Sequence, residues 1–164
     1  MTFEELYQSH YERIYKFCFR FVNDAEKAGD YTQDTFLKLY QRMHKGQQTI
    51  ENPKAWLYKV AGNICLNAVN TEKRRKQIMD GLDLAKAEYI NPENLLLQEE
   101  MAGFIRKALN QLRPEHQLLL LMYQDGLSYK EMSEATGIPS SSIGKTLWRG
   151  IEKVSDLLKK VDHE

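Results

Sequence analysis

The chain has 164 residues, of which 42% are hydrophobic and 28% are charged, and its 23 basic side chains equal its 23 acidic ones in number. This length allows one domain or two small ones, and this composition supports packed cores rather than long disordered tails. No apolar run reaches the roughly 20 residues that span a bilayer, and the N-terminus lacks the apolar stretch of a signal peptide. We therefore expect a cytoplasmic protein without membrane insertion.

The neutral total charge conceals an uneven distribution. Between residues 54 and 76, six basic side chains accompany a single acid, whereas residues 81–100 carry five acids and one base. Such a local basic excess is typical of a nucleic-acid-binding face, and a solvated helix end is an equally weighted alternative. Cys18 and Cys65 form no CxxC motif and fall on expected apolar faces, so we expect buried thiols and no metal or cofactor.

Apolar residues recur at three- and four-residue steps, which predicts helices along the whole chain. Thr2 and Glu5 fit a capping box at the start of a first long helix. Asn23 is expected to cap a second helix, which a polar loop at residues 44–51 follows. Asn52-Pro53 then predicts the start of a third helix, which ends in the basic run.

The middle of the chain is patterned more weakly. Residues 76–91 have poor periodicity and an acidic bias, so we interpret them as a flexible linker, with short helical pieces as an open alternative. Asn91-Pro92 repeats the signal of a cap followed by proline. The simplest architecture is all-α, with two small helical domains at residues 1–75 and 92–164.

The strongest pattern lies in residues 127–161. Ser128 and Glu131 form a second capping box ahead of a short helix. Gly137 follows where the chain must turn sharply, and a longer helix with an apolar stripe begins after Pro139. A short helix, a glycine turn and a longer helix form a helix-turn-helix, in which the first helix braces the second against the major groove. An ordinary helical hairpin, with Trp148 in the core, is the alternative.

The solvent face of the longer helix carries groups that suit DNA. Ser141 and Ser142 lie at its N-terminus, where hydroxyl groups and the helix dipole favour phosphate. Lys145 and Arg149 share a face, and Arg149 can make a bidentate contact to guanine. Trp148 suits a sugar or a thymine methyl group. The candidate residues are Ser141, Ser142, Lys145, Thr146, Trp148, Arg149 and Lys153.

Four segments together resemble one protein family. The C-terminal segment LRPEHQLLLLMYQDGLSYKEMSEATGIPSSSIGKTLWRGIEKV resembles the promoter −35-binding domain of extracytoplasmic-function (ECF) sigma factors. The segments FEELYQSHYERIYKFCFRFV and DYTQDTF are similar to that family's polymerase-binding helices, and WLYKVAGNICLNAVNTEKRRK is similar to its −10-element helix. The segments follow the family's order, and the weakly patterned middle falls where the family has its linker.

The resemblance implies a sigma factor that binds core RNA polymerase and performs no bond chemistry itself. In the family, an Asp-x-x-Gln-Asp stretch docks on the clamp helices of the largest polymerase subunit, which assigns that contact to Asp30, Gln33 and Asp34, with Phe36 turned into the lobe. The C-terminal domain is then expected to rest on the polymerase flap. Family members are commonly held off by an anti-sigma factor, so we expect such a partner.

The resemblance also implies that the third helix reads the opened −10 element. Unpaired bases need stacking surfaces and a cationic track for phosphates. Asn63 and Asn67 share a face and suit base recognition, and the loop at residues 46–52 is expected to close a base pocket. Trp56 is expected in the core, and Tyr58 equally in the core or on DNA. The candidate residues are Lys54, Tyr58, Lys59, Asn63, Asn67, Arg74 and Arg75.

Some residues depart from the family pattern. Gly144, Thr146 and Ile151 replace residues that are commonly Lys or Arg, which implies a weaker phosphate grip or an unusual −35 preference. One alternative function is a stand-alone helix-turn-helix regulator. A second is an adaptor for polymerase or anti-sigma factor that has lost promoter recognition. A helical enzyme is disfavoured, because the four histidines are scattered and no HExxH motif occurs.

Overall fold

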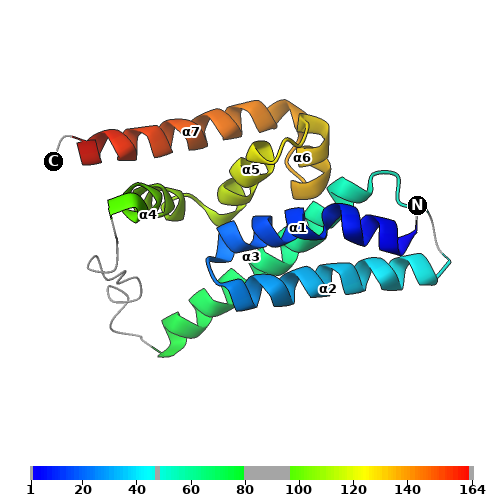
Figure 1. Ribbon diagram of the computed structural model, residues 1–164. Helices are drawn as coiled ribbons and strands as arrows, with labels where there is room; N and C mark the ends of the chain where they lie inside the picture. Colours follow the sequence, from blue (N-terminus) through cyan, green and yellow to red (C-terminus); the bar gives the residue numbers. More distant parts are fainter. Residues whose placement is uncertain (1, 47–48, 80–96, 163–164) are drawn as a thin grey trace.

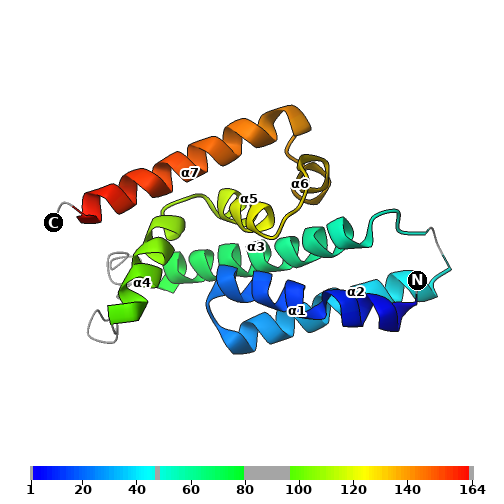
Figure 2. The same ribbon diagram turned by 45° about the horizontal axis from the view of Figure 1, so that its top comes forward.

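The described parts of the chain are almost entirely helical (Figure 1 and Figure 2). The structure, a computed structural model, describes residues 2–46, 49–79 and 97–162. Within these ranges the helices are α1 (Phe3–Val22), α2 (Ala25–His44), α3 (Pro53–Met79), α4 (Leu97–Asn110), α5 (Pro114–Gln124), α6 (Tyr129–Thr136) and α7 (Ser140–Asp162). The all-α prediction is confirmed, and the expected start at Asn91-Pro92 lies outside the described residues.

Helices α1, α2 and α3 form an N-terminal lobe, in which α1 and α2 run antiparallel (Figure 1). The predicted capping box is present, since the Thr2 hydroxyl accepts from the backbone N–H of Glu5. The prediction for Asn23 is wrong. Asn23 ends α1 in a left-handed conformation with φ 54°, which asparagine tolerates better than most residues. The carboxylate of Asp24 instead caps α2 by accepting from the N–H of Lys27 at 3.1 Å.

The interior of this lobe contains a few polar groups, each with a partner. Thr32 and Thr35 are fully buried, and each hydroxyl donates to the backbone carbonyl four residues earlier, at 2.6 and 2.7 Å. Cys18 and Cys65 are free and fully buried, as predicted. The lobe therefore has a packed core that holds α3 in place.

Helix α3 begins where the sequence predicts and is longer than expected. The Asn52 side chain accepts from the N–H of Ala55 at 3.1 Å, and Pro53 occupies the first position. The helix continues through Met79, so the first four residues of the expected linker are helical. Its last turns are exposed on all sides, which leaves the basic run open to solvent.

Helices α4 to α7 form a C-terminal lobe that contains the helix-turn-helix. The Ser128 hydroxyl accepts from the N–H of Glu131 at 3.1 Å in the predicted capping box of α6. Gly137 ends α6 with φ 79°, a conformation that glycine adopts at little cost. Ile143 and Leu147 of α7 are buried in the hydrophobic core. This packing fixes which face of α7 meets solvent.

The two lobes pack directly on each other, a contact that the sequence did not predict. Helices α5 and α6 lie against α1 and α3, and buried residues of both lobes form one hydrophobic cluster (Figure 2). A Cβ atom at Gly62 of α3 would lie 3.6 Å from methyl carbons of Leu118 and Met122 of α5, which is an ordinary van der Waals distance, so the helices pack closely here and still have room for a methyl group. In the ranges that the structure describes, no helix combines the length and apolar character needed to cross a membrane.

Candidate nucleic-acid and polymerase interfaces

The outer face of α7 carries the residues predicted to read duplex DNA. We call this surface, with Lys145, Trp148 and Arg149, the reading face. Lys145, Trp148 and Arg149 are exposed, while Ser142 and Thr146 are half-buried. Trp148 is 64% exposed, which contradicts the alternative that places this side chain in the core. The exposed indole and the two neighbouring cations together offer both apolar and positively charged surface to a ligand.

Two predicted contacts of α7 are already engaged within the lobe. The Thr146 hydroxyl donates to the Ser142 carbonyl at 2.8 Å. The Lys153 ammonium donates to the carbonyl of Gln111 at 3.2 Å. The cationic part of the reading face therefore centres on Lys145 and Arg149.

Tyr129 is a candidate that the sequence did not reveal. A Cβ atom on Gly144 would lie 3.6 Å from its ring, so the tyrosine covers the place where the family commonly has a basic side chain. The Tyr129 side chain is 48% exposed. The reading face thus has an aromatic flank with Tyr129 and Trp148, and a cationic flank with Lys145 and Arg149. The contact joins residues 15 positions apart on two helices, and no local pattern indicates it.

The predicted −10 residues divide into exposed and buried sets. Asn63 and Asn67 are exposed on one face of α3, one turn apart. Tyr58 is fully buried, with its ring edge-on to Phe17 at 4.9 Å between centroids. Its hydroxyl donates to a carboxylate oxygen of Asp125 at 2.7 Å. Burial, and then this bond and the charge of Asp125, raise the pKa of Tyr58 far above its ordinary value. The side chain is inaccessible to DNA in this packing of the lobes.

The basic end of α3 lies beside the start of α2. Arg74 and Arg75 are exposed, as phosphate contacts require. Glu72, the single acid of the basic run, pairs with Lys27 of α2 at 2.6 Å. Because Lys27 neutralises Glu72, the consecutive cations that follow keep their full charge for a phosphate backbone.

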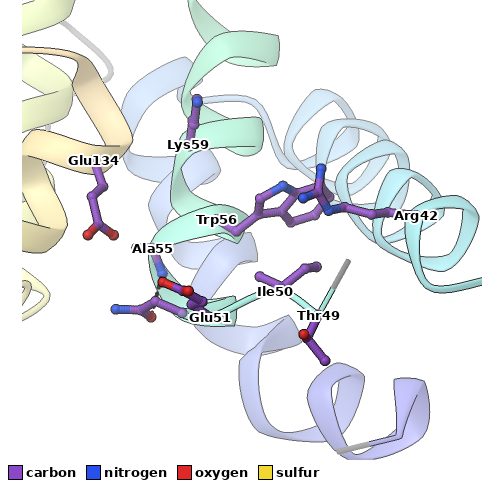
Figure 3. A pocket seen from close by; sticks show the side chains of 9 residues that line it. Arg42, Thr49, Ile50, Glu51, Ala55, Trp56, Lys59 and Glu134 are labelled. Carbon is purple, nitrogen blue, oxygen red and sulfur yellow. Dashed lines mark hydrogen bonds between the residues drawn. The ribbon is translucent and has the colours of Figure 1, made fainter. Parts of the chain in front are cut away.

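An open pocket of about 580 Å³ lies at the start of α3, where the expected specificity loop joins the helix (Figure 3). Trp56 lines this pocket, and the Arg42 guanidinium lies 5.8 Å from the centre of its ring. Trp56 is half-buried and packs on the core only in part, so the prediction of a core tryptophan is incomplete. Ile50 and Lys59 also line the pocket. A flat aromatic surface beside cations suits a stacked nucleobase.

Acidic groups of the C-terminal lobe lie at the rim of this pocket. Glu134 lines it from α6, as Figure 3 shows. The Glu131 carboxylate accepts from the side-chain amide of Asn52 at 3.1 Å. The backbone N–H of Ser128, then the Asn52 amide and the charge of Lys54, lower the pKa of Glu131, although partial burial opposes the shift. The carboxylate is therefore ionised at neutral pH.

The predicted polymerase contact lies on the solvent-exposed face of α2. Asp30, Gln33 and Asp34 are exposed, and Phe36 is buried as expected. Leu37, which is 55% exposed, extends the same face by one turn. An exposed leucine beside three polar groups suits a protein interface with an apolar centre and a polar rim.

Two sequence families match the chain in the predicted order. Residues 6–75 match "Sigma-70 region 2", and residues 105–154 match "Sigma-70, region 4". The RNA polymerase sigma factor YlaC of Bacillus subtilis is 28% identical, over 99% of this chain and 96% of YlaC. The ECF RNA polymerase sigma factor SigE of Mycolicibacterium smegmatis is 26% identical, over 99% of this chain and 64% of SigE.

A solved structure shares the fold. The sigma factor RpoE of Bartonella quintana, determined in complex with the anti-sigma factor NepR, superposes with a TM-score of 0.72 at 22% sequence identity. The superposition covers 96% of each chain. Both sigma regions are present in order, and related proteins that are named sigma factors align along almost the whole chain. The chain therefore belongs to the ECF family of sigma factors of bacterial RNA polymerase.

Proposed function

We propose that residues 1–75 bind core RNA polymerase and read the −10 element, while residues 92–164 read the −35 element. Promoter-specific initiation of transcription is the function of the family and of this chain. In this scheme the polymerase performs the nucleotidyl transfer, and the chain makes and breaks no bonds. It acts in the cytoplasm, where polymerase and promoter DNA are found.

The exposed face of α7 supports the −35 proposal most directly. Arg149 presents a guanidinium that can bind the two acceptors of a guanine, which is worth about 1–3 kcal/mol of base discrimination. Tyr129 and Trp148 offer apolar surface to thymine methyl groups and sugars. Because two cations, Lys145 and Arg149, lie at the centre of this face, we expect a weak phosphate grip and a strong dependence of sequence discrimination on the aromatic flank.

The exposed amides and the pocket at Trp56 support the −10 proposal. Asn63 and Asn67 can both donate to and accept from base edges, and the pocket can hold an unstacked base against the indole. Arg74 and Arg75 follow the phosphate backbone. An everted base that stacks in such a pocket recovers part of the few kcal/mol spent on unstacking it.

Binding to polymerase lets two weak DNA contacts act together, so that the complex has a high affinity for the promoter. The face of α2 with Asp30, Gln33 and Asp34 binds the clamp helices, and the C-terminal lobe rests on the flap. When both lobes sit on one enzyme, each DNA site raises the effective concentration of the other. We further propose that an anti-sigma factor regulates this chain, in parallel with the NepR complex of RpoE.

Run-off transcription with purified core polymerase on a genomic fragment library tests this proposal. Wild type should initiate at a narrow set of promoters. Arg149→Ala should reduce −35-dependent initiation, whereas Asn63→Ala should impair promoter opening with little loss of polymerase affinity. Variants that both transcribe like wild type would refute these residue assignments.

The adaptor remains the competing function, and one observation favours it. The reading helix has Gly144 and Ile151 at positions where the family commonly has basic residues. An adaptor binds polymerase without any promoter-dependent transcript in the same assay. A stand-alone regulator would instead bind a specific duplex tightly without polymerase.

A further inference from the structure

We propose that Cys18 and Cys65 are a modification site, at which a peroxide converts the two thiols into a disulfide that joins α1 to α3. We name these two residues the thiol pair. The inference goes beyond the proposed function, since it concerns the core of the N-terminal lobe and involves neither polymerase nor promoter. The chain has two cysteines in all, so the thiol pair contains every thiol that an oxidant can attack.

The fold brings the two thiols into contact, although the whole of α2 lies between them in the chain. Cys18 lies on α1 and Cys65 on α3, and the Cys65 thiol is hydrogen-bonded to the sulfur of Cys18. Both side chains are 0% exposed and belong to the same hydrophobic cluster. Because cysteine has a short side chain, a hydrogen bond between two thiols brings their backbones close to the separation of about 4.4–6.8 Å between Cα atoms that a disulfide needs.

Neighbouring contacts hold α1 and α3 at a fixed separation. Phe17, next to Cys18 on α1, packs edge-on against Tyr58 of α3, with 4.9 Å between the ring centroids. Both rings are fully buried. Tyr58 and Cys65 lie about two turns apart on α3, and therefore on one face of that helix. The thiol pair thus lies in the same packed seam as these rings, and the two helices cannot move apart without opening the core.

The hydrogen bond makes the two thiols chemically unequal. The hydrogen bond from the Cys65 thiol is the main cause that lowers the pKa of Cys18, although burial opposes the shift. The same bond, followed by burial, raises the pKa of Cys65. The thiolate, and not the thiol, is the nucleophile. Cys18 is therefore the residue that attacks the oxidant, and Cys65 is the residue that closes the disulfide.

The reaction needs hydrogen peroxide and no other reactant. The Cys18 thiolate attacks one peroxide oxygen, the O–O bond breaks, and the departing hydroxide takes up the proton that Cys18 released, which leaves a sulfenic acid and one water. The Cys65 sulfur then attacks the sulfur of the sulfenic acid. The S–O bond breaks, the departing hydroxide takes up the Cys65 proton as a second water, and the S–S bond forms. The two thiols are thereby oxidised by two electrons, and one peroxide is reduced to two waters.

Burial decides when the reaction starts and where it stops. Peroxide reaches the thiol pair only when the core opens locally, so the first step is slow in the folded chain. Once the sulfenic acid has formed, the core closes over it, with the Cys65 thiol beside it and further peroxide excluded. A neighbouring thiol at such a high effective concentration reacts faster than a second peroxide, which would give sulfinic acid. The expected product is therefore a disulfide within one chain.

The disulfide closes a loop that contains all of α2 and ties the candidate −10 helix to α1. A cross-link that closes a loop of this length restricts the unfolded chain, which in a protein of this size raises the midpoint of thermal unfolding by roughly 10 °C. In a reducing cytoplasm such a bond is transient, because thiol reductants return it to two thiols. The oxidised chain is thus a reversible state with a more stable N-terminal lobe.

Peptide mapping of the full chain tests this inference. Wild type is treated with hydrogen peroxide, the remaining thiols are alkylated in denaturant, and the chain is digested without reductant. We expect the loss of both free thiols and one linked fragment that contains Cys18 and Cys65. Dithiothreitol should separate this fragment into its two peptides. Circular dichroism verifies that the oxidised chain keeps its helix content.

Two variants separate the roles of the two thiols. Cys65→Ala leaves Cys18 without a resolving thiol, so peroxide should convert Cys18 to a sulfenic acid that dimedone traps. Cys18→Ala should leave Cys65 as a free thiol under the same conditions. Peroxide also oxidises methionine, of which the chain has six, so peroxide-treated Cys65→Ala is the matched control for the thermal midpoint. Wild type should gain roughly 10 °C over this control and lose the gain again with dithiothreitol.

Three results would overturn the inference. The first is that both thiols stay free after peroxide has oxidised Met79, whose side chain is 78% exposed and reports that the oxidant was active. The second is sulfinic or sulfonic acid in wild type in place of the linked fragment, and the third is a disulfide between two chains. If Cys65→Ala loses helix content, the linked fragment and the dithiothreitol-reversible midpoint of wild type decide the question.

Discussion

The glycine in the reading helix offers a quantitative test of how this lobe holds DNA. Gly144→Lys adds a cation to α7 at a position where the family commonly has one. A Cβ atom there meets the Tyr129 ring at 3.6 Å, an ordinary van der Waals distance. The Tyr129 ring therefore has to move only to make room for the lysine atoms beyond Cβ. Lysine is also a better helix former than glycine by roughly 0.5–1 kcal/mol. We therefore expect a folded variant with one additional phosphate contact.

Salt dependence measures that contact directly. Each added phosphate contact steepens the slope of log K against log salt concentration by about 0.9, so the variant should lose about 3.5-fold more affinity than wild type between 50 and 200 mM salt. Fluorescence anisotropy with a labelled random duplex and the full chain measures both slopes. Gly29→Lys on α2 is the matched control, since a Cβ atom there meets nothing within 4 Å and the added charge is the same. Equal slopes for wild type and Gly144→Lys would show that this face of α7 does not follow the phosphate backbone.

Three further predictions concern stability and pH. Gly62→Ala should raise the free energy of unfolding by about 1 kcal/mol in urea titration, because the new methyl group fits at 3.6 Å and alanine favours helix; a decrease would mean that the lobes pack more tightly there than described. Gly137→Ala should lower it by about 1 kcal/mol, because φ 79° strains any side chain, and an unchanged midpoint would contradict this. The hydrogen bond from the Ser128 N–H is the main cause that lowers the pKa of Glu131 in the folded protein. The ionised carboxylate therefore stabilises the fold fully above the pKa that Glu131 has in the unfolded chain. This stabilisation is lost as the pH falls through the pKa of the folded protein. Below about pH 4.5, the free energy of unfolding should therefore fall less steeply with decreasing pH for Glu131→Gln than for wild type. Identical profiles would show that Glu131 does not contribute to acid unfolding.

Features that depend on neighbours within four residues could be predicted from the sequence. The capping box at Ser128 and Glu131 needs only a hydroxyl and a carboxylate three positions apart, and the structure contains both bonds. Asn23 shows the limit of such signals. Asn23 and Asp24 can both cap a helix, and the side chain that tolerates a left-handed backbone ended α1 while its neighbour began α2.

Features that depend on distant partners could not be predicted in this way. Periodicity left Tyr58 between core and DNA, and its burial is decided by Asp125, 67 residues later in the chain. The position of Arg42 over Trp56 depends likewise on how α2 and α3 cross. The packing of the lobes joins segments on either side of residues 80–96, and no pattern along the chain marks that contact.

Helix α3 fixes the distances between the candidate −10 groups of the N-terminal lobe. Its 27 residues form one unbroken rod of about 40 Å, with the Trp56 pocket at one end, the amides of Asn63 and Asn67 near the centre and the arginines towards the other end. No hinge separates these groups, so their spacing and angular order are set by helical geometry alone. One residue inserted between Asn67 and Arg74 would turn the cationic end by 100° and advance it by about 1.5 Å. Individual side chains along α3 can therefore change without altering this spacing. An insertion or deletion within the helix would instead rotate one end away from the DNA strand that the other end is proposed to bind.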